Sequence, residues 1–331
     1  MDDPLQTLDS IEDAERIRSR RMSGGVATIV ADATGLSGSE RSALEARLKS
    51  AAGAVEGVSE VRVALTASEP RRTLIAIASG KGGVGKSTLS TNLAIAISNM
   101  GKKVGLIDAD VYGPSQTRLL GTDEKPTADE KRLNPVAAHG IKFLSLGQLV
   151  SPGHALAWRG PMASGALAQL VEADWGDAEV LVVDLPPGTG DVQLSLVQKS
   201  LPEGAVIVST PQALSLIDAT RAIDLFGKVS VPVLGLIENM AGYTCPHCGE
   251  TSDPFGSGGA EEAAREFGIP FLGRIPLDPG VRKASDDGLP PSASGGPQAE
   301  AFAAIAQKII AALETAGTSK HSPAEEIADA S

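Results

Sequence analysis

Cysteine and aromatic residues are scarce in this chain. Its 331 residues include two cysteines, whereas a secreted disulfide scaffold uses more cysteines and spreads them along the sequence. Phenylalanine, tyrosine and tryptophan together make up 3% of the residues, which is too little for the stacking surfaces that bind single-stranded nucleic acid. The composition therefore argues against both of these classes of protein.

Positive charge is also in short supply. The formal net charge is −12 and the isoelectric point is about 4.9, and the one basic run, within residues 16–21, follows acidic residues. Binding to phosphate backbones or to anionic membranes needs clustered lysine and arginine. No apolar stretch reaches transmembrane length, and the first residues lack the apolar core of a signal peptide. We expect a cytoplasmic protein that has neither nucleic acid nor a membrane as its partner.

Apolar runs alternate with helical patterns from residue 73 onward. Such alternation predicts a doubly wound α/β fold, with a mainly parallel sheet covered by helices on both faces. The predicted strands are residues 73–78, 103–107, 141–146, 180–184, 205–210, 231–237 and 270–275. The predicted helices are residues 86–99, 162–173, 214–227, 260–267 and 298–313.

The rest of the chain suggests a smaller piece in front of this domain. Residues 25–66 follow a strand, helix, strand pattern and are too few to bury much core by themselves. We expect a flexible terminus at 1–24, a small α+β domain at 25–66, a linker at 67–72, the main domain at 73–316 and a disordered tail at 317–331.

Residues 79–88, Ser-Gly-Lys-Gly-Gly-Val-Gly-Lys-Ser-Thr, are the most informative stretch of the chain. They contain the pattern of a phosphate-binding loop: Gly80, four further residues, and then Gly85-Lys86-Ser87. A predicted strand before this pattern and a predicted helix after it support the match. Lys86 would sit on the β- and γ-phosphates of ATP, and the Ser87 hydroxyl would hold Mg²⁺. The predicted nucleotide-binding residues here are Gly80, Lys81, Gly82, Gly83, Val84, Gly85, Lys86, Ser87 and Thr88.

Lys81 is a second lysine that a standard phosphate loop does not need. It is either a solvated loop residue or a catalytic lysine that reaches across a dimer interface to the partner's nucleotide, as an arginine finger does. The form Lys-Gly-Gly-Val-Gly-Lys-Ser-Thr resembles the deviant Walker A class, which includes MinD, ParA and the nitrogenase iron protein. That resemblance favours the second reading and implies a slow ATP hydrolase.

Aspartates end two of the predicted strands, where ligands bind in doubly wound sheets. Asp108 ends one strand and is a candidate for binding Mg²⁺ through water, and Asp110 beyond it is a candidate for activating the attacking water. Asp184 ends a Walker B strand, Val180-Leu-Val-Val-Asp184. Gly188 in the Pro-Pro-Gly segment that follows could offer its N–H to the γ-phosphate.

Two further strand ends predict a site for the adenine base. Asn239 ends the strand Leu236-Ile-Glu-Asn239, and its amide can both donate to and accept from the base edge. Pro211, just after the neighbouring predicted strand, would form the other wall.

Cys245 and Cys248 lie in one Cys-Pro-His-Cys motif. A zinc or iron–sulfur site usually has four ligands, so a complete site of cysteines requires two chains that each supply this pair. Three uses stay open: a [4Fe–4S] cluster shared between two chains, a zinc ion shared in the same way, or a redox dithiol. The redox dithiol is disfavoured, because such a motif needs a cysteine at the N-terminus of a helix. The segment from Gly249 to Pro254 that follows the motif cannot form a regular helix.

In their order, these motifs resemble the Mrp/ApbC family of iron–sulfur cluster carrier ATPases. The match includes Asp-Ala-Asp-Val-Tyr-Gly-Pro-Ser (108–115), Trp-Arg-Gly-Pro-Met (158–162), Asp-Leu-Pro-Pro-Gly-Thr-Gly-Asp (184–191) and Phe-Gly-Ser-Gly-Gly (255–259). The resemblance implies ATP binding, a homodimer, a labile cluster bridged by Cys245 and Cys248, and its transfer between assembly scaffolds and apoproteins. Residues 25–66 resemble a small domain of cluster-assembly proteins, without its usual cysteine.

Two alternatives to an ATP-dependent cluster carrier remain at this point. A positioning ATPase like MinD or ParA would act on a membrane or on DNA, but predicted helix 298–313 has a single lysine where a membrane-surface helix needs several basic residues. An ATPase with a structural zinc ion between two chains would use the same cysteines.

Overall fold

The chain divides into two units, residues 1–71 and residues 72–331. The structure is a computed structural model, and it describes residues 4–11, 13–34, 36, 38–66, 72–129, 132–149, 160–245 and 247–319. The predicted linker falls outside these residues except for Arg72, and so do the first two residues of the motif at 158–162.

The first unit is a three-stranded sheet with one long helix on its inner face. The strand order is β1-β2-β3, with β1 antiparallel and β3 parallel to β2. Ile29, Leu44 and Leu48 are fully buried between sheet and helix. The elements are η1 (Gln6–Ser10), η2 (Ala14–Arg16), β1 (Ile17–Ser23), β2 (Val26–Asp32), α1 (Gly38–Gly53) and β3 (Glu60–Thr66).

Strand β1 lies where the sequence predicted a flexible terminus. Its sequence is Ile-Arg-Ser-Arg-Arg-Met-Ser. Three of the seven residues are arginines, so the alternation of apolar and polar residues that predicts a half-buried strand is not visible. Arg20 is held by a bidentate contact with Asp9, with Nη2 to Oδ2 at 2.9 Å. Leu5 and Leu8, which precede the strand, are fully buried in the core of this unit. The terminus is therefore tied down by contacts that the local pattern does not reveal.

An eight-stranded sheet forms the centre of the second unit. Its order is β15-β12-β11-β4-β10-β5-β9-β8, and all neighbours are parallel except the edge pair β8 and β9. This confirms the predicted doubly wound, mainly parallel sheet. Its strands are β4 (Thr73–Ala78), β5 (Val104–Asp108), β8 (Val136–Ala138), β9 (Ile141–Ser145), β10 (Val180–Asp184), β11 (Gly204–Ser209), β12 (Val233–Asn239) and β15 (Phe271–Ile275). Two small hairpins are β6 (Thr127–Asp129) with β7 (Arg132–Asn134), and β13 (Tyr243–Thr244) with β14 (Thr251–Ser252).

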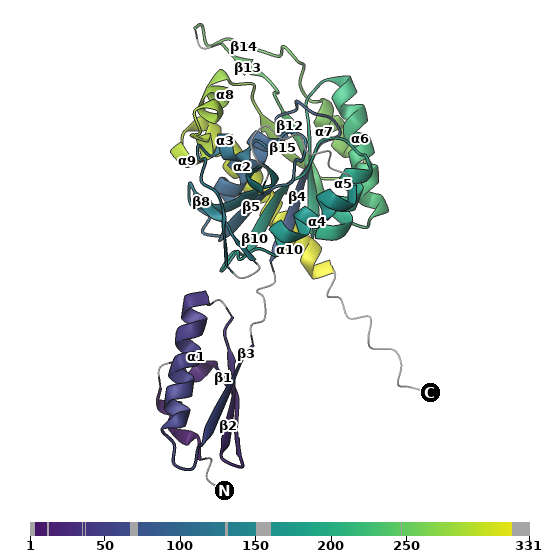
Figure 1. The fold of residues 1–331 in the computed structure, drawn as a ribbon. Coiled ribbons are helices and arrows are strands. Elements are labelled where there is room, and N and C mark those ends of the chain that lie inside the picture. The colour runs from purple at the N-terminus through teal and green to yellow at the C-terminus, as the bar shows by residue number, and fades with distance from the viewer. Residues whose placement is uncertain are drawn as a thin grey trace, which may run out of the picture. The chain divides into compact units, whose positions relative to one another are not determined.

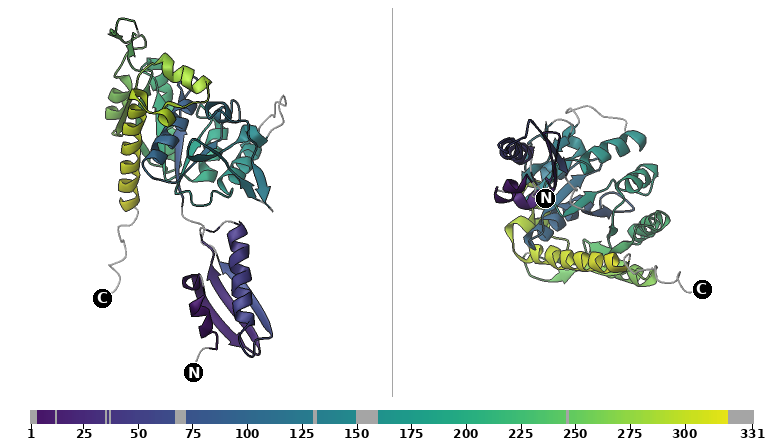
Figure 2. Two further views of the ribbon diagram at one scale, coloured as in Figure 1. Left: turned by 90° about the vertical axis from the view of Figure 1, so that its left-hand side faces the viewer. Right: turned by 90° about the horizontal axis from the view of Figure 1, so that it is seen from below.

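Helices cover both faces of this sheet (Figures 1 and 2). α2 and α10 pack on one face, where Leu93 and Phe302 are fully buried. α4 to α7 pack on the other face around Leu167 and Phe226. The helices are α2 (Lys86–Asn99), α3 (Gln116–Leu119), η3 (Leu146–Leu149), α4 (Gly160–Val171), α5 (Asp191–Ser200), α6 (Ala213–Lys228), α7 (Gly259–Glu266), α8 (Pro279–Asp286), α9 (Pro291–Ser294) and α10 (Pro297–Ser319).

Helix α10 extends further than the sequence pattern predicted. It runs through Ser319, so residues 317–319 are helical rather than part of a disordered tail, and residues 320–331 lie outside the described chain. Phe302, Ile305 and Ile309 anchor the helix in the core, and adding residues to an existing helix costs little.

The strand ends that carry the predicted site residues are neighbours in the sheet. β10 lies between β4 and β5, and Asp184 on β10 is in register with Asp108 on β5. The glycine-rich loop leaves the end of β4 on the other side of β10. Because parallel strands end at the same edge, this topology places the loop and both aspartates together.

Candidate functional site

The glycine-rich loop between β4 and α2 borders a cavity of about 270 Å³. Gly83 and Gly85 have φ values of +79° and +81°, a left-handed conformation that favours glycine. Helix α2 starts at Lys86, so its unpaired N–H groups and the positive end of its dipole lie at this cavity. The predicted residues that line it are Lys81, Gly82, Gly83, Val84, Gly85, Lys86, Ser87, Thr88 and Asp110. The cavity is suited to an anion such as a polyphosphate.

Gly80, the first glycine of the loop, contacts helix α6. A Cβ added at Gly80 would lie 2.0 Å from the carbonyl oxygen of Asp218, so any side chain there must push the backbone of α6 away. Gly80 therefore sets how closely the loop approaches this helix, in addition to any part in nucleotide binding.

We expect Gly80→Ala to lower the free energy of unfolding by about 1–3 kcal/mol, the usual cost of overpacking. Gly227→Ala is the matched control, because Gly227 lies in the same helix α6 with open space around its Cα and should gain roughly 0.5–1 kcal/mol. Both tryptophans belong to the second unit, so urea unfolding followed by tryptophan fluorescence measures the relevant change. A Gly80→Ala protein as stable as wild type would show that the contact with α6 is loose.

Lys86 forms a buried ion pair with the aspartate that ends β10. Its Nζ lies 2.6 Å from Oδ1 of Asp184, and the two side chains are 5% and 0% exposed. Ser90 donates to the same oxygen at 2.8 Å, and Gln116 donates to Oδ2 at 2.9 Å. The phosphate-loop lysine and the Walker B carboxylate are thus in direct contact.

Asp108 is buried beside this pair. Its Oδ2 accepts hydrogen bonds from the backbone N–H groups of Ser115 and Gln116 and from the hydroxyl of Ser145. Burial, and then the charge of Asp184, raise the pKa of Asp108 to about 7. A cation near these two carboxylates would favour the charged form of Asp108.

Asp110 and Lys81 both border the phosphate cavity. Asp110 Oδ1 accepts the backbone N–H groups of Tyr112 and Gly113, and its Oδ2 lies 4.0 Å from the Lys86 Nζ. The Lys81 carbonyl accepts the hydroxyl of Ser79 at 2.9 Å, and the lysine is half-buried. Asp110 is therefore fixed beside the phosphate cavity by two backbone hydrogen bonds, and its part in activating water stays a prediction.

The backbone N–H of Gly188, predicted to be offered to the γ-phosphate, is hydrogen-bonded within the protein. The φ of Gly188 is +99°, but its N–H donates to the carbonyl of Ser79 at 2.9 Å and so is not free for a phosphate. This bond ties the Pro-Pro-Gly segment to the start of the glycine-rich loop. A phosphate could recruit the N–H only after this bond breaks.

Asn239 borders a second cavity, of about 230 Å³, next to the glycine-rich loop. Its Nδ2 donates to the carbonyl of Val84 at 2.7 Å, and Gly85 and Thr88 line the same cavity. The facing wall is residues 275–278, Ile-Pro-Leu-Asp, at the end of β15. A cavity of this size beside the phosphate site can take the base of a nucleotide.

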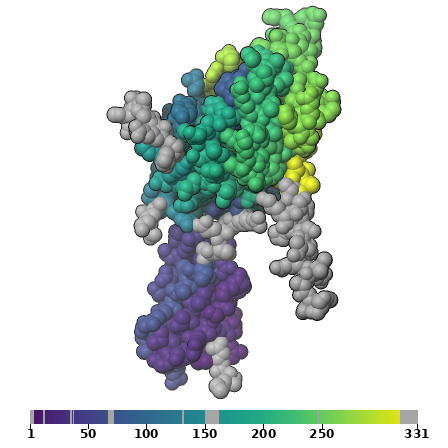
Figure 3. Space-filling model, turned by 90° about the vertical axis from the view of Figure 1, so that its right-hand side faces the viewer, coloured from purple at the N-terminus to yellow at the C-terminus, as the bar shows by residue number. Residues whose placement is uncertain are grey.

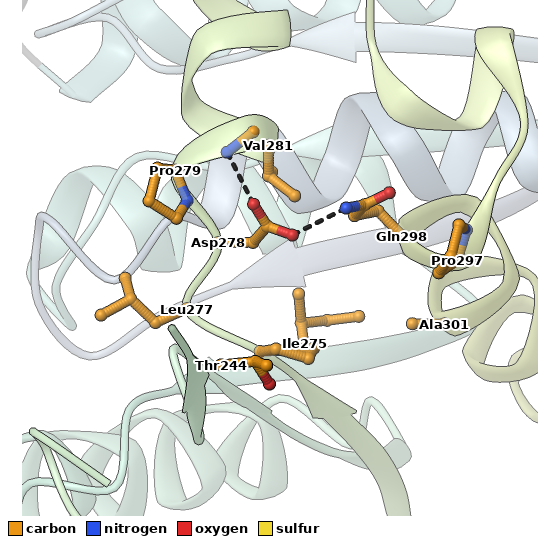
Figure 4. Close-up of a pocket in the computed structure, with 11 residues that line it drawn as sticks. Thr244, Ile275, Leu277, Asp278, Pro279, Val281, Pro297, Gln298 and Ala301 are labelled. Atoms are coloured by element: carbon orange, nitrogen blue, oxygen red, sulfur yellow. Dashed lines mark hydrogen bonds between the residues drawn. The ribbon is translucent and has the colours of Figure 1, made fainter. Parts of the chain in front are cut away.

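The wall at 275–278 also borders a third cavity, of about 310 Å³, on its other side (Figure 4). There Asp278 caps α8 by accepting the N–H of Gly280 at 2.6 Å, and its second oxygen accepts Gln298 Nε2 at 2.7 Å. Thr244, directly before Cys245, lines the same cavity. The segment that faces Asn239 therefore also reaches the base of the cysteine hairpin.

Pro211 is not brought to the base cavity. Among the described residues that line the base and phosphate cavities Pro211 does not occur, and it lies instead near Gly259 at the start of α7, where a Cβ added to Gly259 would be 3.0 Å from the carbonyl oxygen of Pro211. The reason is the strand order, since β12 lies between β11 and β15, and the wall facing Asn239 comes from β15.

The cysteines lie on a hairpin that projects from the carboxyl edge of the sheet (Figures 1 and 3). Strands β13 and β14 flank them, and the Cys245 N–H donates to the Glu250 carbonyl at 2.9 Å. Backbone N–H groups of Cys248 and then His247 donate to the Cys245 sulfur and, with the Cys248 side chain, lower the pKa of this thiol. A stabilised thiolate is the form that binds metals.

One chain does not complete a metal site with these thiols. Cys245 is half-buried, Cys248 is exposed, and both are free thiols. Within the described part of the chain, no three or more histidine, cysteine, aspartate or glutamate side chains gather as metal ligands. His247, between the two cysteines, is exposed as well.

Several residues of the site escaped the sequence prediction, although some left a signal. Ser90 lies one helical turn after Lys86, so helical spacing alone points it to the same place. Gln116 and Ser145 bond the aspartates from other elements, which only the fold reveals. The wall at 275–278 follows a predicted strand, and the rule that ligands bind at strand ends would have found it.

Known proteins are similar to this chain over most of its length. Residues 71–310 match the family described as NUBPL iron-transfer P-loop NTPase, within the ParA group. The chain is 47% identical over 248 residues to the iron–sulfur protein required for NADH dehydrogenase, mitochondrial, of Arabidopsis thaliana, across 73% of this chain and 79% of that protein. It is 45% identical over 298 residues to the iron–sulfur cluster carrier protein of Deinococcus radiodurans, across 86% of this chain and 83% of that protein.

Solved structures share the fold of the second unit. The nucleotide-binding protein of Archaeoglobus fulgidus in complex with ADP is 40% identical, with a TM-score of 0.61 over 70% of this chain and 91% of that one. The cell division ATPase MinD of Pyrococcus furiosus has a TM-score of 0.55 over 73% of this chain and 99% of that protein. It is 22% identical in sequence, so this similarity is evidence for the fold only.

No helix in the described residues combines the length and the apolar character that a membrane crossing needs.

Proposed function

The chain belongs to the family of NUBPL-type iron-transfer P-loop NTPases, whose members carry iron–sulfur clusters, and from that premise we propose a division of labour among its residues. Residues 80–88 bind ATP, Asn239 and the wall at 275–278 hold its base, and Cys245 and Cys248 carry the cluster. Two copies of the chain hold one cluster between them and deliver it to apoproteins.

The observation that carries this proposal is the course of β12. The strand ends at Asn239 beside the glycine-rich loop, and the chain then leads directly into the hairpin with both cysteines. A nucleotide site and a dithiol therefore leave the sheet from the same strand end. This connection gives a direct route along the chain from the nucleotide site to the thiols.

In this proposal the buried lysine and the aspartates perform the hydrolysis. Lys86 exchanges Asp184 for the β- and γ-phosphates, Lys81 contributes positive charge from the partner chain, and Asp110 orients the attacking water. Gly188 releases Ser79 and donates to the γ-phosphate, so the segment after β10 moves with the state of the nucleotide.

The residues also fit Mg²⁺, because Ser87 lies at the phosphate cavity, the buried Asp108 and Asp184 end neighbouring strands, and hydroxyl and carboxylate oxygens are the ligands that this ion prefers. Ser87 would hold the ion, and the two aspartates would orient its water ligands. When bound, the ion would neutralise charge on the phosphates.

The matches to known proteins also help to decide between cluster transfer and the two alternatives, a positioning ATPase and an ATPase with a shared zinc ion. The match to cluster carriers at 45–47% identity favours cluster transfer over positioning, because the likeness to MinD at 22% extends to the fold alone. A cytoplasmic site of action remains our prediction, and the Arabidopsis relative is a mitochondrial protein. A zinc ion between two chains would use the same four thiolates as a cluster.

Metal analysis separates the cluster from the zinc ion. We expect protein purified and reconstituted without oxygen to contain iron and acid-labile sulfide in equal amounts, with four of each per two chains and little zinc. Absorption near 400 nm should rise with iron content, and added apoprotein should take the cluster up. Stoichiometric zinc without sulfide would contradict the proposed cargo.

A further inference from the structure

Glu238 is a buried carboxylate at the carboxyl end of β12, and it is fully shielded from solvent. Successive side chains of a strand point to opposite faces, so Glu238 lies on the face opposite to Asn239. Asn239 bonds the glycine-rich loop through Val84. Glu238 therefore lies next to the nucleotide site in sequence but does not face it.

Glu238 closes the base of the segment that carries the cysteines, which we call the cysteine loop (residues 240–258). Its Oε2 accepts the N–H of Gly258 at 3.0 Å, and its Oε1 accepts the N–H of Ala260 at 2.8 Å. Glu238, two residues before the loop, is thus bonded to the last residue of the loop and to the start of α7.

The first residues of the loop are tied to the end of β15. Ala241 donates to the carbonyl of Ile275 at 3.1 Å, and Leu277 donates to the carbonyl of Gly242 at 2.8 Å. Both ends of the cysteine loop are therefore bonded at the same edge of the sheet, while the hairpin with the thiols projects beyond it (Figure 1). The base, rather than the hairpin itself, determines where the thiols lie relative to the sheet.

Arg274 balances the buried charge of Glu238. Its Nε donates to Glu238 Oε2 at 2.8 Å, its Nη2 pairs with Glu261 on α7, and its guanidinium lies 5.1 Å from the centre of the Phe271 ring. A buried carboxylate is costly unless it is paired and hydrogen-bonded, and here three donors satisfy it. A pair of apolar residues could fill the same space, so a carboxylate at this point indicates a need for fixed geometry.

We propose that Glu238 is the positioning residue of the cysteine loop: it fixes Cys245 and Cys248 relative to the sheet so that the thiols of two chains can meet at one metal centre. The proposal rests on the proposed function of the cysteines. It predicts that Glu238 affects metal binding and leaves nucleotide binding unchanged, because Asn239 and Val84 lie on the other face of the strand.

The test compares Glu238→Gln with Glu261→Gln in the full-length protein. Both substitutions remove one carboxylate partner of Arg274, but Glu261 is half-exposed, and in the described part of the chain Gly258 and Ala260 bond Glu238 rather than Glu261, so Glu261→Gln is the matched control. Co²⁺ is titrated into cluster-free protein without oxygen, and the thiolate-to-cobalt absorption is followed. ADP affinity and amide hydrogen exchange are measured on the same samples.

We expect Glu238→Gln to weaken Co²⁺ binding by about tenfold, because one charged hydrogen-bond acceptor is lost at the loop base. Exchange at Gly258 and Ala260 should accelerate, while ADP affinity stays at the wild-type value. Glu261→Gln should match wild type in all three measurements. Wild-type cobalt affinity and exchange in Glu238→Gln, or equal weakening in both variants, would overturn the proposal.

The experiment also distinguishes a failure of the proposed function, metal binding by the cysteines, from a failure of the proposal for Glu238. Wild-type protein without a thiolate–cobalt band would contradict metal binding by the cysteines, whereas the exchange comparison would still decide whether Glu238 holds the loop. If Glu238→Gln does not fold, Glu238→Asp replaces it, because it keeps the charge that pairs with Arg274 and draws the carboxylate back from the N–H groups of Gly258 and Ala260. A loss of cobalt affinity with faster exchange at Gly258 supports the proposal, and no change in either overturns it.

Discussion

Replacing Lys86 with methionine is expected to destabilise the nucleotide-free protein by about 3–5 kcal/mol, in addition to abolishing ATP hydrolysis. The substitution leaves Asp184 fully buried without its cation, 2.6 Å from where Nζ was. Such a carboxylate must either stay charged at high cost or take up a proton. Hydrolysis should fall by at least about 100-fold, because a charge that stabilises the transition state is lost.

The two effects of Lys86→Met can be separated by a second substitution. Adding Asp184→Asn removes the unpaired charge and should restore about 2 kcal/mol or more of stability without restoring hydrolysis. Urea unfolding followed by tryptophan fluorescence measures the first quantity, and phosphate release measures the second.

Lys228→Met is the control for Lys86→Met. Lys228 pairs with Asp224 at 2.7 Å, but both side chains are more than half exposed, so its loss should change stability by less than about 0.5 kcal/mol. If Lys86→Met unfolds at the wild-type urea concentration, or if the double variant is no more stable than the single one, the buried pair does not carry the charge balance of the site.

Replacing Cys245 with alanine is expected to reduce cluster content after anaerobic reconstitution to less than about a tenth of the wild-type value. A centre shared between two copies would keep two of its four thiolates, and open positions on a cluster admit water and exchange. ADP affinity should not change, since Cys245 lies outside the residues that border the phosphate and base cavities.

Ser252→Ala is the control for Cys245→Ala, because Ser252 lies on β14 of the same hairpin and is exposed. It should reconstitute like wild type. Retention of a full cluster by Cys245→Ala would show that the ligands lie elsewhere, whereas loss of the cluster in both variants would indicate that the hairpin, rather than the thiol, is the sensitive part.

The sequence predicted the phosphate side of the site well, because each element there has a local signature. The glycine-rich loop, Asp108 and Asp184 all follow short apolar runs, and such runs predict strands whose ends meet at one edge of a parallel sheet. The sequence did not show that β10 lies between β4 and β5, but the rule that parallel strands end at one edge was enough to expect the loop and both aspartates at that edge.

The base side was harder to predict, because it depends on which strand lies next to which. Pro211 follows β11 and Asn239 follows β12, but the wall that faces Asn239 comes from β15, far along the chain. The same limit hid the role of Glu238, whose partners lie 20 and more residues away. Strand β1 was missed for another reason, since its arginines mask the apolar alternation.

The native mass of the reconstituted protein, recorded without oxygen, tests the central claim most directly. We predict a species of two chains with one cluster, and single chains without any, because each chain supplies only the two thiolates of Cys245 and Cys248. A single chain that carries a complete cluster would contradict the claim that two copies must join to build the centre.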